Sequence, residues 1–223
     1  MDTQTLGLIS VTLNAVNPMT EYIQGHHKGI RLKNYLDTGL QDLVREEGKV
    51  TDKSMLRLLS LLHLAVADRV DGVLLTCTVF SPYVDRLKTL FSFPIVGVDA
   101  AMLEKAVMNE GKTAILYTFP ATRATSETLF HAAEKRLGVT RELSMEFVEG
   151  ANDALQRGDG ELHDQLILKK IQELDGKHDQ LVLAQVSMAR VAAKATACSV
   201  PILTSPAEAV RTILAQLQTS RER

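Results

Sequence analysis

Two periods of apolar residues alternate along the chain. Short aliphatic and β-branched runs, such as "LGLISV" at 6–11 and "GVLLT" at 72–76, predict buried strands. Between these runs lie longer segments with apolar residues three to four positions apart, as in residues 54–66, and this spacing predicts helices with one buried face. Near-continuous apolar strands that alternate with helices are typical of parallel sheets covered on both faces.

The pattern gives a set of expected elements. Strands are expected at 6–11, 30–37, 72–76, 94–98, 112–117, 144–149, 180–184 and 201–205. Helices are expected at 54–66, 81–91, 99–109, 122–137, 160–174, 187–197 and 206–218, while residues 20–30 fit either a helix or a loop. Gly138 is expected to end the 122–137 helix. Leu162, Leu166 and Leu174 define the expected buried face of the 160–174 helix.

The second part of the chain repeats the pattern of the first part. Pairs of positions that open matching strands have nearly equal offsets: 108 for Asp71 and Asp179 (179 − 71), 107 for Pro94 and Pro201 (201 − 94), and 107 for Leu6 and Thr113 (113 − 6). Any α/β chain shows some echo of this kind, but three near-equal offsets favour an internal duplication. We therefore expect two pseudo-symmetric, doubly wound α/β halves, residues 1–98 with 206–223 and residues 99–205. Their sheets are expected to face each other, with the active site in the cleft beyond the carboxyl ends of the strands.

Polar residues collect where the expected strands end. In the first half they are Asn14, Asn17, Thr20, Asp37, Thr76, Cys77 and Thr78; in the second half they are Thr118, Thr122, Glu149, Gln185, Ser187 and Thr204. This set is rich in hydroxyls and amides and poor in cations. Such a lining suits a small carboxylate that is held by neutral hydrogen-bond donors and helix N-termini.

Cys77 is the candidate reactive residue of this set. It stands between Thr76 and Thr78, shortly before a helix expected to have Ser81 at its N-cap and Pro82 at its first helical position. The positive end of that helix would favour the thiolate over the thiol. The alternative is that Cys77 is a small buried hydrophobic residue, but such a site does not need a hydroxyl on each side.

The other cysteine and the histidines are not expected to have a catalytic or metal-binding role. Cys198 comes before a strand in "TACSVPIL", so it belongs at the other end of the sheet and is expected to be structural. The six histidines show no metal-ligand spacing, and no metal site is expected. "EGKT" at 110–113 precedes a strand instead of following one, so it does not support a nucleotide site.

Composition narrows the possible partners and location. The 223 residues have a formal net charge of −2, 4% aromatic residues and no Trp, so neither nucleic acid nor a membrane surface is expected as a partner. Two cysteines do not make a disulfide framework, and the N-terminus lacks the pattern of a signal peptide. The longest apolar stretch, "LLSLLHLAVA", is too short to cross a bilayer. We expect a soluble cytoplasmic protein.

Four segments together resemble the aspartate/glutamate racemase superfamily, which includes hydantoin racemases, maleate isomerases and arylmalonate decarboxylases. "NPMT" at 17–20 resembles the element after the first strand in hydantoin racemases, and "DGVLLTCTVFSP" at 71–82 resembles the first catalytic-cysteine segment. "FPIVGVDAAMLEKAV" and "VPILTSPAEAV" resemble the segments that close each half. The resemblance covers nearly the whole chain and implies two pseudo-symmetric α/β domains, no cofactor and a homodimer.

The resemblance also implies a role for Cys77. In the two-base racemases of this superfamily, one cysteine thiolate removes a proton next to a carboxylate and a second cysteine returns a proton on the opposite face. Cys77 matches the first cysteine, whereas Gln185 stands in place of the second and cannot act as an acid or a base. A racemase would therefore need another proton donor, such as Glu149, Asp37 or bound water.

Three functions remain open at this point. The first is a Cys77-dependent racemase or isomerase of a small carboxylate, such as an amino acid or a related carbon acid. The second is a decarboxylase of malonate-type acids, which needs a proton donor on one face only. The third is a cleft that binds a carboxylate without catalysis. Superfamily frequency favours the first, and the single cysteine favours the second.

Overall fold

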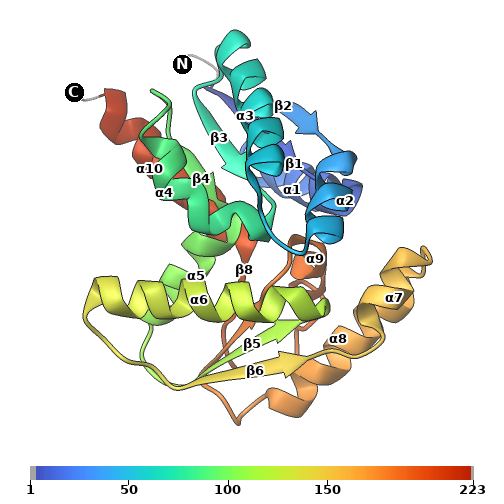
Figure 1. Cartoon of the computed structure of the whole chain (residues 1–223). Coiled ribbons are helices and arrows are strands. Elements are labelled where there is room, and N and C mark those ends of the chain that lie inside the picture. Colours follow the sequence, from blue (N-terminus) through green and yellow to red (C-terminus); the bar gives the residue numbers. More distant parts are fainter. Residues whose placement is uncertain (1–3, 222–223) are drawn as a thin grey trace. The chain divides into compact units, whose positions relative to one another are not determined.

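The computed structural model describes residues 4–221 and divides the chain into two compact units. Unit 1 comprises Met1–Val98 and Ala209–Arg223, and unit 2 comprises Asp99–Glu208. Each unit contains one parallel four-stranded sheet with helices packed on it (Figure 1). The predicted α/β fold with two parallel sheets is confirmed.

The sheet of unit 1 has the strand order β2-β1-β3-β4. Its strands are β1 (Gln4–Ser10), β2 (Ile30–Leu36), β3 (Gly72–Leu75) and β4 (Ile95–Gly97). The helical elements between them are α1 (Leu13–His26), α2 (Thr38–Glu47), α3 (Asp52–Ala67), η1 (Thr78–Tyr83) and α4 (Val84–Lys88), where η denotes a 3₁₀ helix. The last helix, α10, spans Ser205–Arg221, and its part after Glu208 also belongs to unit 1. All strand pairs are parallel, so every carboxyl end lies at the same edge of the sheet.

The two faces of this sheet pack against different helices. Ile9 and Leu75 face a core that also contains Leu40 of α2, Leu58 of α3 and Val84 of α4. On β3, Gly72 leaves room for α10. A Cβ atom at this glycine would lie 3.0 Å from Cδ1 of Ile213, so a larger residue would require the Ile213 side chain to shift.

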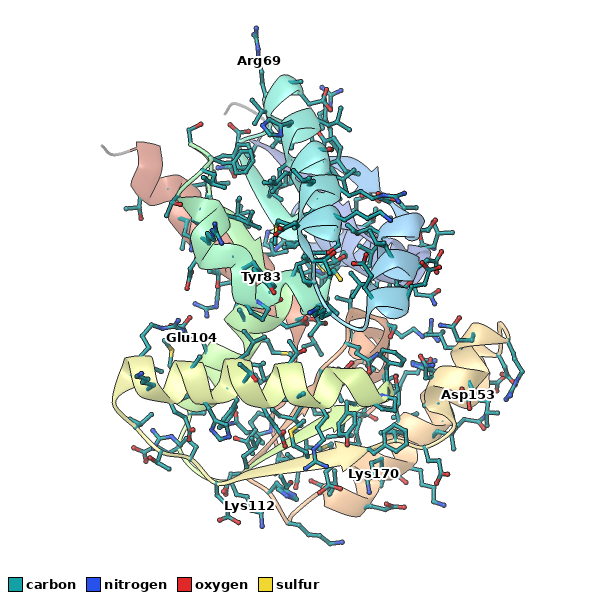
Figure 2. The ribbon with its side chains drawn as sticks, in the orientation of Figure 1. Arg69, Tyr83, Glu104, Lys112, Asp153 and Lys170 are labelled. Atoms are coloured by element: carbon teal, nitrogen blue, oxygen red, sulfur yellow. The ribbon has the colours of Figure 1, made fainter. Side chains whose placement is uncertain are left out.

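The connection from α3 to β3 uses an unusual backbone conformation. Arg69 has a φ of 53°, in the left-handed region that residues other than glycine seldom adopt. Its side chain projects away from the end of α3 into solvent (Figure 2). Val70 is buried directly after it, so the turn at Arg69 redirects the chain from the helix into the core.

The sheet of unit 2 has the corresponding order β6-β5-β7-β8. Its strands are β5 (Thr113–Tyr117), β6 (Leu143–Phe147), β7 (Gln180–Leu183) and β8 (Ile202–Thr204). Its helical elements are α5 (Val98–Met108), α6 (Pro120–Leu137), α7 (Ala151–Gln156), α8 (Gly160–Leu174), η2 (Val186–Met188) and α9 (Ala189–Ala192). Glu146, the one charged residue of the edge strand β6, pairs with Lys170 of α8 at 3.3 Å; Lys170 is labelled in Figure 2.

Alternating residues of β5 and β7 serve two cores. Leu116 and Leu183 pack with Ile167 and Ile171 of α8 on one face. Ile115 packs with residues of α5 and α6 on the other face, and Figure 1 shows α6 and α8 on opposite sides of this sheet. These four- and five-residue strands are therefore buried on both faces, which explains their near-continuous apolar sequence.

The backbone hydrogen bonds repeat between the units. Thr76 N donates to the Ile9 carbonyl at 3.0 Å, and Ala184 N donates to the Leu116 carbonyl at 3.0 Å. Other matching bonds join Val73 N to Pro94 O and Leu181 N to Pro201 O, each at 2.9 Å. Asp71 Oδ2 accepts from Thr5 N at 2.7 Å, and Asp179 Oδ2 accepts from Lys112 N at 2.6 Å. The offset found in the sequence therefore corresponds to equivalent positions in two similar folds.

Several expected helices are confirmed. The 160–174 helix is α8, and α6 ends where Gly138 adopts a φ of 69°. The expected buried face of α8 is wrong in part, because His163, Asp164, Ile167 and Ile171 are buried while Leu162 and Leu166 are only half-buried. The spacing of apolar residues predicted the position of the helix correctly, but it did not indicate that polar residues lie on its buried face.

Two local expectations are wrong, and one helix was not expected. Ser81 is not the N-cap of a long helix, because a 3₁₀ turn begins at Thr78 and contains both Ser81 and Pro82; only the five residues of α4 are α-helical. The 187–197 helix is reduced to the short η2 and α9. α1 begins at Leu13, so residues 13–19, to which no element was assigned, belong to a helix that contains Pro18.

None of the helices within residues 4–221 combines the length and the apolar character that a membrane crossing requires.

Candidate functional site

The carboxyl end of β3 carries Thr76, Cys77 and Thr78. Thr76 is buried, and its hydroxyl lies 3.2 Å from the Ile9 carbonyl oxygen and 3.0 Å from the Ser10 hydroxyl. These contacts join the ends of β1 and β3, which are the two central strands of unit 1. The Thr76 hydroxyl therefore fixes the backbone from which Cys77 departs.

Cys77 lies at the point where β3 gives way to η1. It is half-buried at the border of the apolar core, and its carbonyl accepts the first hydrogen bond of η1, from Phe80 N at 3.1 Å. Thr78, also half-buried, is the first residue of η1. Because η1 is a short 3₁₀ turn and α4 has five residues, Cys77 has less support from a helix dipole than the sequence predicted.

Three predicted residues lie on α1. Asn14 and Asn17 are exposed, and Thr20 is half-buried with an Oγ1 atom that has no hydrogen-bond partner among residues 4–221. Steps of three residues place them one after another along one side of the helix. Asn14 is closest to the end of β1, whereas Thr20 lies roughly 10 Å further along the helix axis than Leu13, at 1.5 Å per residue.

Asp37 follows β2 and forms an ion pair with Arg57. Arg57 of α3 donates to its carboxylate through Nε and through Nη2, the latter at 2.7 Å from Oδ1. The hydrogen bond to Asp37 also raises the pKa of Arg57. Gly39 makes room for this pair, because a Cβ atom there would lie 2.6 Å from Nη2 of Arg57. Both oxygens of the Asp37 carboxylate are therefore engaged by Arg57.

In unit 2, Thr118 and Gln185 are joined directly. Oε1 of Gln185 accepts from the backbone N of Thr118 at 2.7 Å and from its hydroxyl at 2.9 Å. A backbone N–H can only donate, so the Gln185 oxygen and not its nitrogen must face Thr118. The amide group of Gln185 thus has a defined orientation.

The other predicted residues of unit 2 surround the same sheet edge. Thr122 is buried in the first turn of α6, and its backbone N donates to the Phe119 carbonyl at 3.0 Å. Ser187 is buried in η2, and Thr204 is the half-buried last residue of β8. Glu149 is exposed between β6 and α7.

Cys77 and Gln185 occupy equivalent positions in the two units. Each follows the strand next to the first strand of its sheet and is the N-cap residue of a 3₁₀ turn. In each case the backbone carbonyl accepts from the residue three positions later, Phe80 N at 3.1 Å and Met188 N at 2.9 Å. Cys77 and Gln185 therefore mark the same point at the carboxyl edge of each sheet, with a thiol in unit 1 and a carboxamide in unit 2.

Two buried acidic residues were missed by the sequence reasoning. Asp99 is 1% exposed in the first turn of α5, directly after β4. An acidic residue just beyond a strand, as in "VGVDAA", was the available signal. Asp164 is 4% exposed on α8, and nothing in the periodicity of α8 distinguishes it from a solvated residue.

Asp164 organises the segment that follows Gln185. Its carboxylate accepts from Nε of Arg190 at 2.9 and 3.0 Å, from Nζ of Lys194 at 2.6 Å and from Nδ1 of His163 at 2.8 Å. Arg190 also donates to the Gly160 carbonyl at 3.1 Å. These bonds attach the four-residue α9, and with it the turn that carries Gln185 and Ser187, to the start of α8.

Burial controls the ionisation of this cluster. Burial lowers the pKa of His163, and its hydrogen bond to Asp164 only partly opposes that effect. Burial also opposes ionisation of Asp164, but hydrogen bonds from Lys194, His163 and Arg190 hold the pKa of Asp164 below its ordinary value. Nε2 of His163 is buried with no partner within the described residues, so a proton on it would have nothing to bond. His163 is therefore neutral in the folded protein at neutral pH.

This cluster predicts a pH dependence of stability. A histidine whose pKa is lowered by folding stabilises the protein above the unfolded-state pKa of about 6.5, and this contribution is lost as the pH falls through the folded-state value. Between pH 7.5 and 5.5 the free energy of unfolding should fall more in the wild type than in His163→Asn, which keeps a donor for Asp164 but cannot titrate. The difference should not exceed about 1.4 kcal/mol per pH unit, the limit for one proton. Urea unfolding at both pH values measures it, and equal losses would contradict a neutral buried His163.

Cys198 lies at the other end of the second sheet, as predicted. It precedes β8, and its Sγ is 3.6 Å from Oδ1 of Asp175 and 3.5 Å from the Val200 carbonyl oxygen. Burial raises the pKa of its thiol. It borders a hollow of about 270 Å³ between α8 and the segment after α9. A second hollow, of about 450 Å³, lies between Phe93 and α10 in unit 1; Cys77 and Gln185 line neither.

No group of three His, Cys, Asp or Glu side chains within residues 4–221 is arranged to hold a metal ion.

Several solved structures share this fold. An aspartate racemase from Picrophilus torridus superposes with a TM-score of 0.73 at 11% identity, over 96% of this chain and 94% of that chain. A glutamate racemase from Bacillus anthracis gives a TM-score of 0.71 at 13% identity, over 99% and 84% of the two chains. An allantoin racemase from Klebsiella pneumoniae gives 0.73 at 16% identity, over 97% and 89%. At these identities the likeness establishes the fold.

The sequence itself gives the family. A search of curated proteins finds no match. Residues 44–213, well over half of the 223 residues, match the family described as Asp/Glu/Hydantoin racemase. The sheet order, the duplicated architecture and this match agree with one another. The chain belongs to the Asp/Glu/hydantoin racemase family and is an enzyme.

Proposed function

We propose that the enzyme moves a proton at the carbon next to the carboxylate of a small carbon acid, without a cofactor, and that the thiol of Cys77 is its acid and base. The observation that carries the proposal is the position of Cys77. It is a half-buried thiol at the carboxyl end of a central strand, between two hydroxyl residues. In open α/β sheets this edge is where ligands bind.

The reaction needs two proton transfers. The Cys77 thiolate takes the proton from the carbon, and the electron pair of the broken C–H bond moves into the carboxylate to give an enediolate. A proton then adds back to the same carbon, which returns the electron pair to a C–H bond. Addition from the opposite face inverts the carbon, and addition from the Cys77 face restores it.

Neutral donors are expected to hold the substrate. Asn14 and Asn17 of unit 1, Thr78 beside Cys77, and Thr122, Ser187 and Thr204 of unit 2 are the proposed contacts, together with the Gln185 amide. Thr20 and the two residues that fix the site backbone and the amide, Thr76 and Thr118, complete the proposed set. Hydrogen bonds from such groups favour the enediolate because its oxygens carry more negative charge than those of the substrate.

Glu149 is the first candidate for the second proton donor. It is exposed beyond the end of β6, and no described residue pairs with its carboxylate. Asp37 ranks after Glu149. Arg57 engages both oxygens of Asp37, so this ion pair would have to open before Asp37 could transfer a proton.

A decarboxylase is the second candidate function, and the Gln185 amide favours it. A malonate-type acid that loses CO₂ leaves the same enediolate, and the Cys77 thiol alone can protonate it. Gln185 offers only N–H donors, because Thr118 occupies its oxygen. Membership in a racemase family argues against the third alternative, a carboxylate-binding protein without catalysis.

One experiment separates these reactions. The enzyme is incubated in D₂O with both enantiomers of aspartate, glutamate and allantoin, and with arylmalonates, and products are analysed by mass spectrometry and chiral chromatography. We expect deuterium at the carbon next to the carboxylate or its equivalent carbonyl; a racemase exchanges it without mass loss, and a decarboxylase also releases CO₂. A substrate that is converted without deuterium at that carbon contradicts the proposal.

The resemblance also implies a homodimer. Light scattering after size exclusion should then give twice the chain mass of 24.5 kDa.

A further inference from the structure

Two Thr–Gln pairs link the strands β5 and β7, one at each end. Thr113 and Gln180 stand at the amino end, and Thr118 and Gln185 stand just beyond the carboxyl end. Both threonines are buried, and both glutamines bond to the threonine of their own pair. The two pairs therefore provide an internal comparison of what each glutamine does.

Gln180 has every polar atom of its amide engaged. Its Oε1 accepts from Nδ2 of Asn109 at 2.7 Å. Its Nε2 donates to the Ala106 carbonyl and to Oγ1 of Thr113, both at 2.7 Å. With 1% of its surface exposed, Gln180 is a structural cross-link between β7, β5 and α5.

Gln185 is engaged at one end only. Two donors of Thr118 saturate its Oε1, whereas its Nε2 has no partner within residues 4–221. The side chain is half-buried, so the two N–H groups reach the surface of unit 2 at the carboxyl edge of the sheet. Acceptance of two hydrogen bonds at oxygen polarises the amide and strengthens its N–H groups as donors.

Thr118 cannot serve a ligand while this pair exists. Its backbone N–H and its hydroxyl both point to Gln185, and only 2% of the residue is exposed. The donors of Thr118 are therefore used to orient the amide, and the amide replaces them at the surface.

We propose that Thr118 is a positioning residue and that Gln185 determines specificity: the pair presents two fixed N–H donors and no acceptor, and so selects a carboxylate or enediolate oxygen. An ammonium group at this place finds no lone pair, because Thr118 uses those of Oε1. This inference rests on the proposed function for the identity of the bound oxygen. The orientation of the amide does not depend on it.

NMR of the ¹⁵N side-chain amides tests the proposal on the whole protein. The Gln185 signal is assigned by its loss in Gln185→Glu. Malonate serves as an acceptor-only probe and methylammonium as a donor-only probe, at constant ionic strength. Thr118→Val removes the hydroxyl at constant size, Thr118→Ser restores it, and Thr113→Val is the matched control at the other end of β5.

We expect the Gln185 amide of the free wild type to be as rigid as the backbone, and malonate but not methylammonium to shift its signal. Thr118→Val should mobilise the amide and weaken malonate binding roughly fivefold to tenfold, the loss of one buried hydrogen bond. Thr118→Ser should return both values to within about twofold of the wild type. Thr113→Val, which removes a bond of Gln180, should leave both unchanged even if it lowers stability.

Other outcomes overturn the inference. A mobile Gln185 amide in the wild type would contradict the positioning role. Equal malonate affinity in the wild type and Thr118→Val, or a shift with methylammonium, would contradict the selection of an acceptor. A rigid amide that responds to malonate in an enzyme without Cys77-dependent exchange would support the inference while contradicting the proposed function.

Discussion

Cys77→Ala should lose proton exchange at the substrate carbon by at least about 100-fold, the lower end of what a positioned acid or base contributes. Cys77→Ser should be similarly impaired, because a hydroxyl is far less acidic than a thiol and is a poor base in the same geometry. Deuterium incorporation from D₂O measures the effect directly. Cys77 is half-buried at the core border, so urea unfolding of each variant shows whether the fold persists.

Cys198→Ala is the matched control. The thiol of Cys198 makes weak contacts with Asp175 and the Val200 carbonyl at the amino end of β8, and burial holds its pKa high. Its loss should leave exchange nearly unchanged. An essential Cys198 with a dispensable Cys77 would mean that the reactive edge of both sheets has been misassigned.

Gln185→Cys should confer or increase racemisation. Residue 185 is the equivalent of residue 77 in the second unit, so the change supplies a thiol at the position that the first unit already uses. Inversion needs donors on both faces of the planar enediolate, and we expect this thiol to supply the donor on the face opposite to Cys77. A product that the wild type forms in D₂O as a single enantiomer should become a mixture, which chiral chromatography detects.

The gain should depend on both thiols. Cys77→Ala combined with Gln185→Cys should not racemise, and Gln185→Ser, which shortens the side chain without adding a thiol, should not either. The change also frees the donors of Thr118, so substrate affinity should change together with stereochemistry. Rapid racemisation by the wild type would instead reveal a second base, with Glu149 the first residue to replace and Asp37 the next.

The sequence was sufficient to predict which segments form the parallel strands of each sheet. Strands such as β5 and β7 are buried on both faces, so they appear as uninterrupted apolar runs. The equal offsets between the halves mark structurally equivalent positions: Asp71 and Asp179, for example, accept equivalent backbone hydrogen bonds. Short turns were predicted less well. Ser81 and Pro82 have the composition of a helix start, but the chain had already entered a 3₁₀ turn at Thr78, which depends on the tertiary contacts of Phe80 and Val84 with the core.

The site was predictable to the level of strand ends and not further. Parallel strands bring their carboxyl ends to one edge, so residues such as Cys77 and Thr118 followed from topology. Contacts between side chains did not. Thr118 and Gln185 are 67 residues apart, and Arg190 and Asp164 are 26 apart. No local sequence pattern can therefore predict either hydrogen bond. A glutamine at the position of the second cysteine argues against two-thiol racemisation, but only the structure shows that the oxygen of this glutamine is occupied by Thr118.

A crystal structure of the enzyme with malonate bound tests the central claim most directly. The account predicts one bound malonate, with Sγ of Cys77 within contact distance of its central carbon and Nε2 of Gln185 donating to one of its oxygens. It also predicts that Oε1 of Gln185 remains bonded to Thr118. Malonate bound elsewhere, or Cys77 and Gln185 opening onto opposite outer surfaces, would contradict the shared site.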